Sequence, residues 1–574
     1  MLLKADIAEK WIRYGNRRQA RKSALAPAAL GFVTQPEPRS IGSFARGRQI
    51  IAGNFLFAGH LVEAKDAAIW DLPIPDTSYE EALHGFSWLS DLAAVGDPDA
   101  RLRAQAWVQL WIARFGKGRG AGWTPDLTGR RLIAWVNHAV FLLNGVPKEA
   151  SVAYFKSLAH QVDYLSKRAS YASVGLPRFE ALSGLIYGGL SLSGLEAQVA
   201  PAIAQLAEDC EREIDASGGI KTRNPEELLE VLTLLLWAER AIFSAGIAMP
   251  VAIKQAIERI VPTLRALRHS DGSLARFHGG GRGLEGRLDG ALASVRVALA
   301  DVKSPMGFTR LQGGRTSVIM DTACPPSGET MGNGHASSLA FELTSGRRPL
   351  VVNAGSGANF GMDWHKAGRA SASHSTVVVD GMSSSRLGRT KSTYGGKKIL
   401  ALEVTPKFVD VTVEDRIDRQ ILQAGHNGYQ DTHGLVHARD VTLYKNGRGI
   451  EGADILATVS DEDRLLFDQA VDRAGFEGVP FALHFHLHPD VSAELDMNGK
   501  AVSLALKSGE VWVFRHDGQA KLSIEQGAYL EKDRLKPRVT KQVVLKSVAV
   551  EYASRIKWSF AKAQDTPTHL RDTA

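Results

Sequence analysis

The spacing of apolar residues changes near Pro305, and this change most constrains how the chain can fold. Before Pro305, apolar residues recur at intervals of three and four, which is typical of helices with one buried face. After it, short apolar runs alternate with turn residues, as β-strands do. A run of helices followed by a run of strands predicts an α+β multidomain chain, with an α unit ahead of an antiparallel β-sandwich.

The periodic segments give definite expectations for the elements of both units. Glycine, proline or asparagine separates successive helical segments. The expected helices are 100–115, 129–143, 152–168, 179–190, 195–216, 225–245, 252–267 and 284–301. The expected strands are 308–311, 316–320, 339–343, 350–352, 377–379, 409–413, 441–444, 481–488, 511–514 and 543–552.

Length and composition fit a large protein of two or three domains. The 574 residues are 44% hydrophobic, which suffices for substantial cores. A net charge of +7 favours polyanionic partners, of which acidic polysaccharide is our expectation and nucleic acid is not. Two cysteines predict neither a disulfide framework nor a cysteine metal site. No run is long enough for a transmembrane helix, and oligomeric state is left open.

Histidines and an arginine flank three apolar runs between residues 331 and 381. His335 precedes the run at 339–343, Asn353 follows the run at 350–352, and Arg369 and His374 precede the run at 377–379. Side chains at strand ends can reach a groove, and together these groups could bind and deprotonate an acidic sugar. The alternative for each histidine is a buried, hydrogen-bonded imidazole with a structural role.

This stretch resembles the C-terminal domain of the heparinase II/III family. The similarity lies in Gly334-His335, in the strand ending at Asn353, and in Arg369 through His374-Ser-Thr-Val-Val-Val-Asp-Gly381. The resemblance implies an incomplete α/α toroid, preceded by a short ribbon at 47–59 and followed by the β-sandwich. We therefore divide the chain into a basic lead-in arm (1–45), the toroid (46–303), the sandwich (304–560) and a polar tail (561–574).

The resemblance also implies β-elimination across a uronic acid, with His335 and His374 as catalytic residues, supported by Arg369. A site for this reaction neutralises the uronate carboxylate, removes the C5 proton and protonates the leaving O4. Ser337 and Asn353 stand where the family's metal-binding branch has histidine and aspartate. We therefore expect no zinc and no other cofactor.

The toroid lacks the family's Asn-His and tyrosine motifs where they are expected. The corresponding stretches are Gly175-Leu-Pro-Arg-Phe-Glu180 and 218–226, where Asn224-Pro225 replaces the tyrosine. Tyr187 is the catalytic substitute we expect, although a tyrosine between apolar residues is also a common core residue. Asn224 is a candidate substrate contact, with helix capping as its alternative role.

Residue spacing along a predicted helix and a predicted strand gives further candidate substrate contacts. Arg131, Trp135 and His138 share one helical face, so that Trp135 could stack on a sugar and Arg131 could pair with its carboxylate. The alternative is a core tryptophan beside a solvated arginine. His437 and Arg439 share a strand face, as in a His-x-Arg segment of the family, and could flank the groove.

His484, His486 and His488 alternate along one strand, which leaves a transition-metal site open as an alternative.

Two functions follow from the sequence. The first is a polysaccharide lyase that cleaves an acidic, uronate-containing glycan. The second is a catalytically weak or silent glycan-binding or scaffold protein of the same fold. The basic arm has no apolar leader segment, so a cytoplasmic location is expected, with the cell envelope as the alternative. Replacing His335 with alanine removes no large apolar surface, so we expect little loss of stability, and we expect turnover to fall by about a hundredfold or more.

Overall fold

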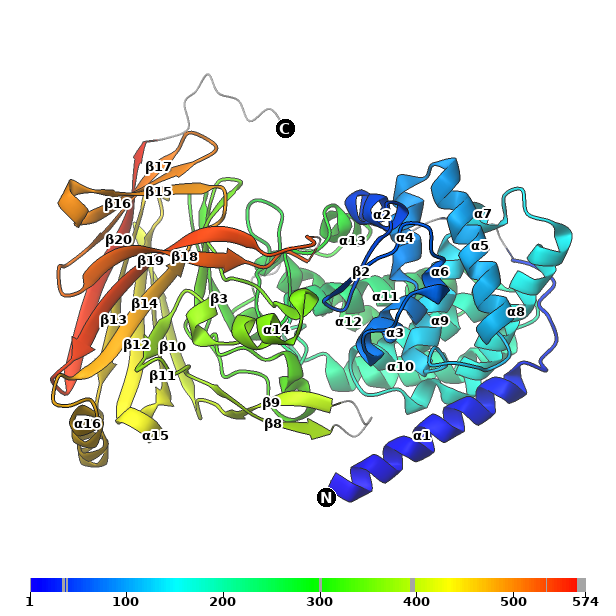
Figure 1. The fold of residues 1–574 in the computed structure, drawn as a ribbon, viewed down its shortest axis with the longest axis horizontal. Helices are drawn as coiled ribbons and strands as arrows, with labels where there is room; N and C mark the ends of the chain where they lie inside the picture. Colours follow the sequence, from blue (N-terminus) through cyan, green and yellow to red (C-terminus); the bar gives the residue numbers. More distant parts are fainter. Residues whose placement is uncertain are drawn as a thin grey trace.

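The chain divides into helices and strands where the sequence changes its period (Figure 1). The computed structural model describes residues 2–33, 37, 40–298, 302–392, 398–532 and 534–564. An incomplete α/α toroid comes first and an antiparallel β-sandwich follows it, which confirms the predicted fold class. The toroid and the sandwich lie side by side along the long axis of the molecule.

The toroid begins with a short helix and a ribbon of two strands. These are α2 (Phe44–Ile51), β1 (Asn54–Phe57) and β2 (His60–Glu63). The following helices are α3 (Thr77–His84), α4 (Ser87–Val95), α5 (Pro98–Phe115), α6 (Pro125–Asn137), α7 (Ala139–Leu143), α8 (Lys148–Arg168), α9 (Leu176–Ser191), α10 (Ala200–Glu213), α11 (Pro225–Ser244), α12 (Val251–Ala266) and α13 (Arg287–Ala293). The helix predicted at 129–143 is interrupted at His138. The helix predicted at 284–301 is shorter, and residues 299–301 lie outside the described residues.

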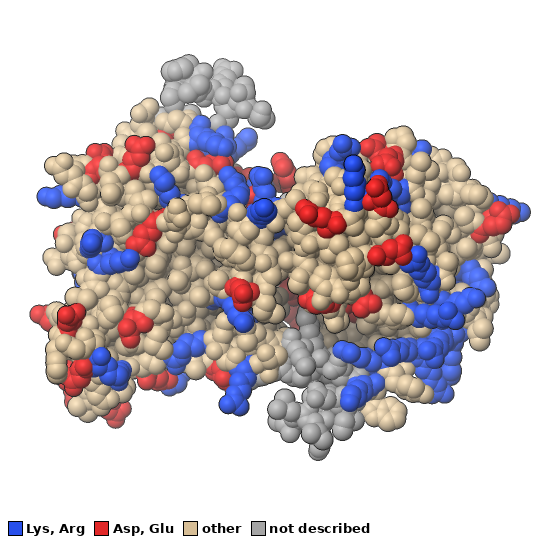
Figure 2. Space-filling model, viewed as in Figure 1, with Lys and Arg blue, Asp and Glu red and all other residues tan. Residues whose placement is uncertain are grey.

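The lead-in arm contains a long helix, α1 (Leu2–Ser23), that the sequence prediction missed. It packs against α8, where Arg168 Nε donates to Asn16 Oδ1 at 2.8 Å. Arginine and lysine side chains gather along α1 at the lower right of Figure 2. Much of the positive charge on this face of the protein therefore lies on the arm.

The sandwich consists of one large sheet opposed by two smaller ones. The large sheet has the order β10-β11-β12-β13-β20-β17-β16-β15, and the smaller ones are β18-β19-β14-β7 and β3-β4-β5-β6. An isolated bridge between Val351 and Leu487 joins the two smaller sheets. All their strand pairings are antiparallel, as expected.

The strands of the smaller sheets are β3 (Phe308–Gly313), β4 (Thr316–Asp321), β5 (Phe341–Ser345), β6 (Arg348–Val351), β7 (Val377–Val379), β14 (Val479–His486), β18 (Lys521–Tyr529) and β19 (Arg538–Ala549). The strands of the large sheet are β10 (Val409–Asp415), β11 (Arg419–Tyr429), β12 (Leu435–Tyr444), β13 (Gly449–Ala457), β15 (Val491–Asp496), β16 (Ala501–Leu506), β17 (Val511–His516) and β20 (Ala553–Gln564). A separate hairpin pairs β8 (Arg386–Ser392) with β9 (Lys398–Val404), and short helices α14 (Met362–Gly368), α15 (Gln430–His433) and α16 (Asp461–Arg473) connect strands. Strand β20 continues into the predicted polar tail as far as Gln564.

Buried hydrogen bonds connect the toroid to the sandwich. Arg223 donates to the backbone carbonyls of Met306, Gly307, Ala323 and Cys324 and pairs with Asp321 at 2.5 Å. These contacts join the loop before α11 to the first strands of the sandwich. The two domains therefore pack directly against each other.

Candidate functional site: the groove between toroid and sandwich

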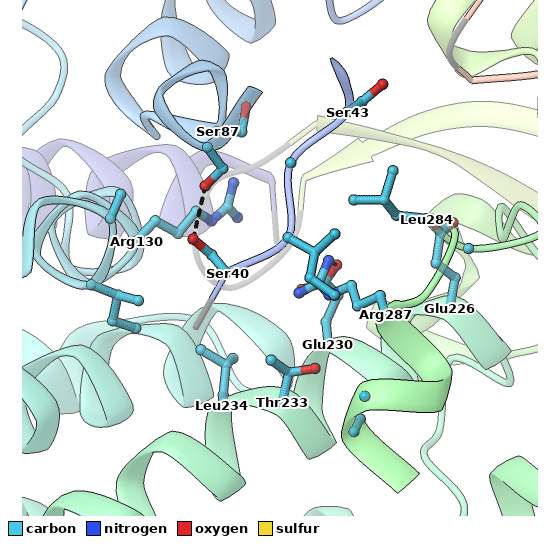
Figure 3. A pocket seen from close by; sticks show the side chains of 18 of the residues that line it. Ser40, Ser43, Ser87, Arg130, Glu226, Glu230, Thr233, Leu234, Leu284 and Arg287 are labelled. Atoms are coloured by element: carbon cyan, nitrogen blue, oxygen red, sulfur yellow. Dashed lines mark hydrogen bonds and ion pairs between the residues drawn. The ribbon is translucent and has the colours of Figure 1, made fainter. Parts of the chain in front are cut away.

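A groove of about 1890 Å³ lies between the toroid and the sandwich. Its walls come from the segment 40–46, from α4, α6, α9, α11 and α13, and from residues 529–532 and 534 of the sandwich. Figure 3 shows Arg130 on one side of the groove and Glu230 with Arg287 on the other, with the segment carrying Ser40 and Ser43 between them.

Two helices present regularly spaced side chains to the groove. On α6 the lining residues are Arg130, Ile133, Ala134 and Asn137, and on α11 they include Glu230, Thr233, Leu234 and Trp237. Both sets follow the i, i+3, i+4, i+7 spacing of a single helical face. Each helix therefore contributes one face to the groove, and the face of α11 is longer than that of α6.

Two glycines bring α6 and α9 close enough for their groove residues to meet. A Cβ on Gly129 would lie 2.2 Å from the backbone oxygen of Glu180, and a Cβ on Gly184 would lie 2.5 Å from Gly129 Cα. Only glycine permits this approach without moving the backbone. Arg130, the residue after Gly129, consequently reaches Glu180, with Nε 2.6 Å from Oε1.

A second polar pair lies two turns further along the same helices. The Tyr187 hydroxyl donates to Asn137 Oδ1 at 2.8 Å. Trp237 lies beside Tyr187, with ring centroids 6.4 Å apart, and is half-buried where it lines the groove. The Arg130–Glu180 and Asn137–Tyr187 pairs thus form a polar row along the groove floor, and Trp237 stands next to its second member.

The charges of the groove largely neutralise each other. The described lining residues include eight acidic and nine basic side chains. Five ion pairs connect them, namely Arg46–Asp91, Arg130–Glu180, Arg287–Glu230, Lys532–Glu226 and Arg534–Glu531. The groove is therefore close to electrically balanced, unlike the strongly basic α1.

Glu180 is a groove carboxyl whose pKa lies well above its ordinary value. Burial raises its pKa to about 7, although Arg130 opposes this shift. Its Oε2 atom is buried and has no hydrogen-bond partner among the residues that the structure describes. A carboxyl group with such a pKa is present in both protonation states near neutral pH, and can therefore accept or donate a hydrogen bond.

His335 and His374 meet, as the sequence predicts, but they lie in the interface between the domains and do not line the groove. His335 Nδ1 is 3.0 Å from His374 Nε2, and both side chains are fully buried. His374 Nδ1 lies 2.8 Å from the carbonyl oxygen of Ala370, and His335 Nε2 accepts from the Gly279 backbone amide at 3.1 Å.

These contacts specify the protonation of both rings. A carbonyl can only accept, so His374 carries its proton on Nδ1 and accepts on Nε2 from His335 Nδ1. His335 Nε2 is already occupied as an acceptor by Gly279. Burial lowers the pKa of His374 to about 4 and that of His335 well below its ordinary value. The pair is therefore neutral, and every ring nitrogen in it has a partner.

A buried aspartate on β4 completes the interface cluster. Burial alone would raise the pKa of Asp321, but Arg223 and His278 hold it well below its usual range. Ser337 donates to Asp321 Oδ2 at 2.6 Å, and Asn353 Oδ1 accepts from a backbone amide at 3.1 Å. A hydroxyl and an amide that are already bonded in this way do not fit a zinc ion. No group of three or more His, Cys, Asp or Glu in the described parts of the chain is arranged to hold a metal.

Arg369 and Asn353 hold the segments that carry the histidines of this cluster. Arg369 donates to the carbonyls of Met331, Gly334 and Leu400, so its guanidinium fastens the loop before His335. Asn353 Oδ1 accepts from the Ser375 amide, next to His374. Both side chains are buried.

Arg131 and Trp135 lie on the opposite side of α6 from the groove. The Arg131 guanidinium is buried, donates to Gln161 and Gly122, and lies 4.1 Å from the ring of Trp111. Burial lowers its pKa to about 9. Trp135 stacks on Tyr154 inside the toroid. This placement corrects the predicted face of the helix, because the groove face begins one residue earlier, at Arg130.

His138 and Asn224 support the groove from behind. His138 Nε2 lies 2.8 Å from Ser40 Oγ and 3.2 Å from Ser90 Oγ, and both serines line the groove. Asn224 Oδ1 accepts from the backbone amides of Glu226 and Glu227, which is the capping role that the sequence left open. Tyr187 lies beside the groove residue Trp237, and its hydroxyl bonds to Asn137 at the groove floor.

His437 and Arg439 lie inside the sandwich and do not flank the groove. Both pair with Asp454, at 2.7 Å each, and Arg439 also donates to the carbonyls of Leu339 and Ser375. The two carbonyl bonds of Arg439 connect the large sheet to the segments that precede β5 and β7.

The alternating histidines of β14 have separate partners. His484 bonds to Gln542, His486 to the carbonyl of Ala372, and His488 lies beyond the end of the strand, against Tyr529.

The sequence analysis missed Arg130, Glu180, Glu230 and Trp237 as groove residues. Glu180 stands in the stretch searched for Asn-His, and Trp237 lies on a helix rich in leucine. The polar residues Arg130 and Asn137, seven apart on α6, and Glu230 and Thr233 on α11 were the signal that could have found this face.

Comparisons with known proteins agree with this architecture. Residues 302–559 match the family described as Heparinase II/III-like, C-terminal. The chain is 30% identical to FtsZ-localized protein C of Caulobacter vibrioides over 580 aligned residues, covering 97% of this chain and 94% of the relative.

Solved structures share the fold at low sequence identity. Heparinase III has a TM-score of 0.67 at 13% identity, covering 96% of this chain and 89% of the other. A mutant of heparan sulfate lyase HepC from Pedobacter heparinus has a TM-score of 0.57 at 15% identity, covering 98% and 90%.

The toroid, the sandwich and the groove between them define a protein with the fold of polysaccharide lyases. The family match and the full-length relative make the assignment more specific. The chain belongs to the heparinase II/III family. No helix in the described residues is long and apolar enough to cross a membrane.

Proposed function

We propose that the protein binds a glycan in the groove and does not cleave it by β-elimination through His335 and His374. The state of His335 carries this proposal. Its Nδ1 is bonded to His374 and its Nε2 to the Gly279 amide, inside the domain interface. A general base needs a free nitrogen within hydrogen-bond distance of the substrate proton. His335 has neither the free nitrogen nor the position.

Glycan binding itself is supported by the family and by the shape of the site. The family and fold are those of polysaccharide lyases. The groove is large, and its floor carries polar pairs beside a half-buried tryptophan. Polar groups that fix orientation, together with an aromatic surface, are typical of small-molecule and sugar sites.

A lyase acting on an acidic, uronate-containing glycan is the second candidate. Arg130 and Glu180 favour it, because a guanidinium could neutralise a uronate and a carboxyl with a pKa near 7 could take its C5 proton. For this second candidate, the catalytic groups would be Arg130 and Glu180 and not the predicted histidines.

Elimination leaves a conjugated C4=C5 double bond, which separates the two candidates. We expect no time-dependent ultraviolet absorbance when the protein is incubated with a panel of uronate polysaccharides, whereas groove variants should lose glycan binding. The negative control is protein denatured before incubation. Absorbance that grows with time in the wild-type protein but not in Glu180→Gln would contradict the proposal of binding without cleavage. It would instead indicate a lyase whose catalytic group is the Glu180 carboxyl.

A further inference from the structure

We propose that Asn137, Glu180 and Trp237 form a subsite for an uncharged, hydroxyl-rich glycan. This inference rests on the proposed glycan binding and names the class of glycan. It differs from the acidic polymer that the net charge of the whole chain suggests.

The first support is a pair of buried polar atoms without protein partners. Glu180 Oε2 and Asn137 Nδ2 are both buried, and neither has a hydrogen-bond partner in the described part of the protein. Both residues line the groove, and both are more than nine-tenths buried as whole residues. An unpaired buried polar atom costs about 1–3 kcal/mol, so a ligand that supplies the missing partner recovers that energy.

The second support is the chemistry and spacing of these atoms. Glu180 offers an acceptor, or a donor when protonated, and the Asn137 amide offers a donor, which are the partners of sugar hydroxyls. Arg130 and Asn137 are seven residues apart on α6, which is about 10 Å along a helix. The row that they anchor is therefore long enough for a short oligosaccharide segment.

The third support is the aromatic surface next to this row. Trp237 is half-buried and lines the groove close to Tyr187, which bonds to Asn137. The C–H face of a pyranose packs on such a ring through apolar contact that does not require charge.

Ion pairing of the groove cations favours a neutral glycan over an acidic one. Arg130, Arg287 and Lys532 already pair with Glu180, Glu230 and Glu226 across the groove wall. A uronate that approached any of these cations would also meet the carboxylate paired with it, and like charges at short range are unfavourable. Hydroxyl groups bond to both members of such pairs without this repulsion.

Calorimetric titration of the full chain tests the inference with three hexasaccharides of equal length. Two are neutral, a hexose oligomer and an N-acetylhexosamine oligomer, and the third is a hexauronate. We expect a neutral oligomer to bind at least tenfold more tightly than the hexauronate. Its Kd should change less than about twofold between 50 and 500 mM salt, because screening weakens only charge interactions.

Three variants locate the site. Glu180→Gln and Trp237→Phe should each weaken neutral-glycan binding by about tenfold, while thermal melts report whether they fold. Glu285→Gln is the matched control, since Glu285 is an exposed acid that also lines the groove but lies outside the floor. Equal losses in Glu180→Gln and Glu285→Gln would overturn the subsite.

The remaining outcomes separate this inference from the proposed function. Tighter binding of the hexauronate, with steep salt dependence, would overturn the neutral-glycan assignment and leave glycan binding intact. Failure of all three oligomers to bind would overturn both.

Discussion

Replacing His335 with alanine should lower the free energy of unfolding by about 2–4 kcal/mol, because buried partners lose their bonds. His374 Nε2 and the Gly279 amide would both be left without a hydrogen bond inside the interface between the domains. The sequence analysis expected little loss of stability, since the substitution removes no large apolar surface. Denaturant unfolding of the two proteins measures the difference.

A surface histidine supplies the control for this experiment. His60 is substantially exposed and contacts only one carboxylate, Asp76, at 3.2 Å among its described contacts. His60→Ala should change stability by less than about 0.5 kcal/mol. If His335→Ala is as mild as His60→Ala, the hydrogen-bonded arrangement of His335 described above is wrong.

Acidification should destabilise the protein strongly between about pH 6.5 and pH 4. Burial lowers the pKa of His138, His374 and His488 to about 4 and that of His84 and His486 to about 3. In the unfolded chain histidine titrates near 6.5. Below that pH the unfolded chain binds protons that the folded protein excludes, so stability present at neutral pH is lost as the pH falls.

The size of this loss of stability follows from the pKa shift of each titrating group. For His374, a change from 6.5 to about 4 corresponds to about 3 kcal/mol, lost in full only near pH 4. Glu180 acts in the opposite direction, because its pKa is raised to about 7 and protonation favours the folded state. Several buried histidines outweigh this single carboxyl.

Melting temperature measured from pH 8 to pH 4 tests the prediction. We expect a steep decline below pH 6.5. His374→Gln should reduce the decline, since glutamine has no proton to bind, even if it lowers stability at neutral pH. A melting temperature that stays level between pH 7 and pH 5 would contradict the neutral state assigned to these histidines.

The sequence predicted the architecture because apolar spacing distinguishes a helix from a strand. It did not identify the groove face of α6, because that helix is buried on nearly all sides. When apolar residues surround a helix, their period no longer indicates which side faces a cavity. Arg130 and Arg131 are neighbours in sequence, yet one pairs with Glu180 at the groove and the other lies among tryptophans.

The histidine pair shows a different limit of sequence reasoning. The motif correctly predicted that His335 and His374 meet. Their burial depends on how the loop at 278–279 of the toroid docks on the sandwich, which local sequence does not encode. The Gly279 amide and the His278 ring that hold His335 come from the other domain.

The bonds of Arg223 bear on how the proposed glycan would enter the groove. Its guanidinium joins the toroid to four carbonyls and one carboxylate of the sandwich. Swinging the two domains apart would break all five of these bonds and leave a buried cation without them, at a cost far above thermal energy. The two domains therefore form a groove of fixed width, and the proposed glycan would enter it from its open side without any domain movement.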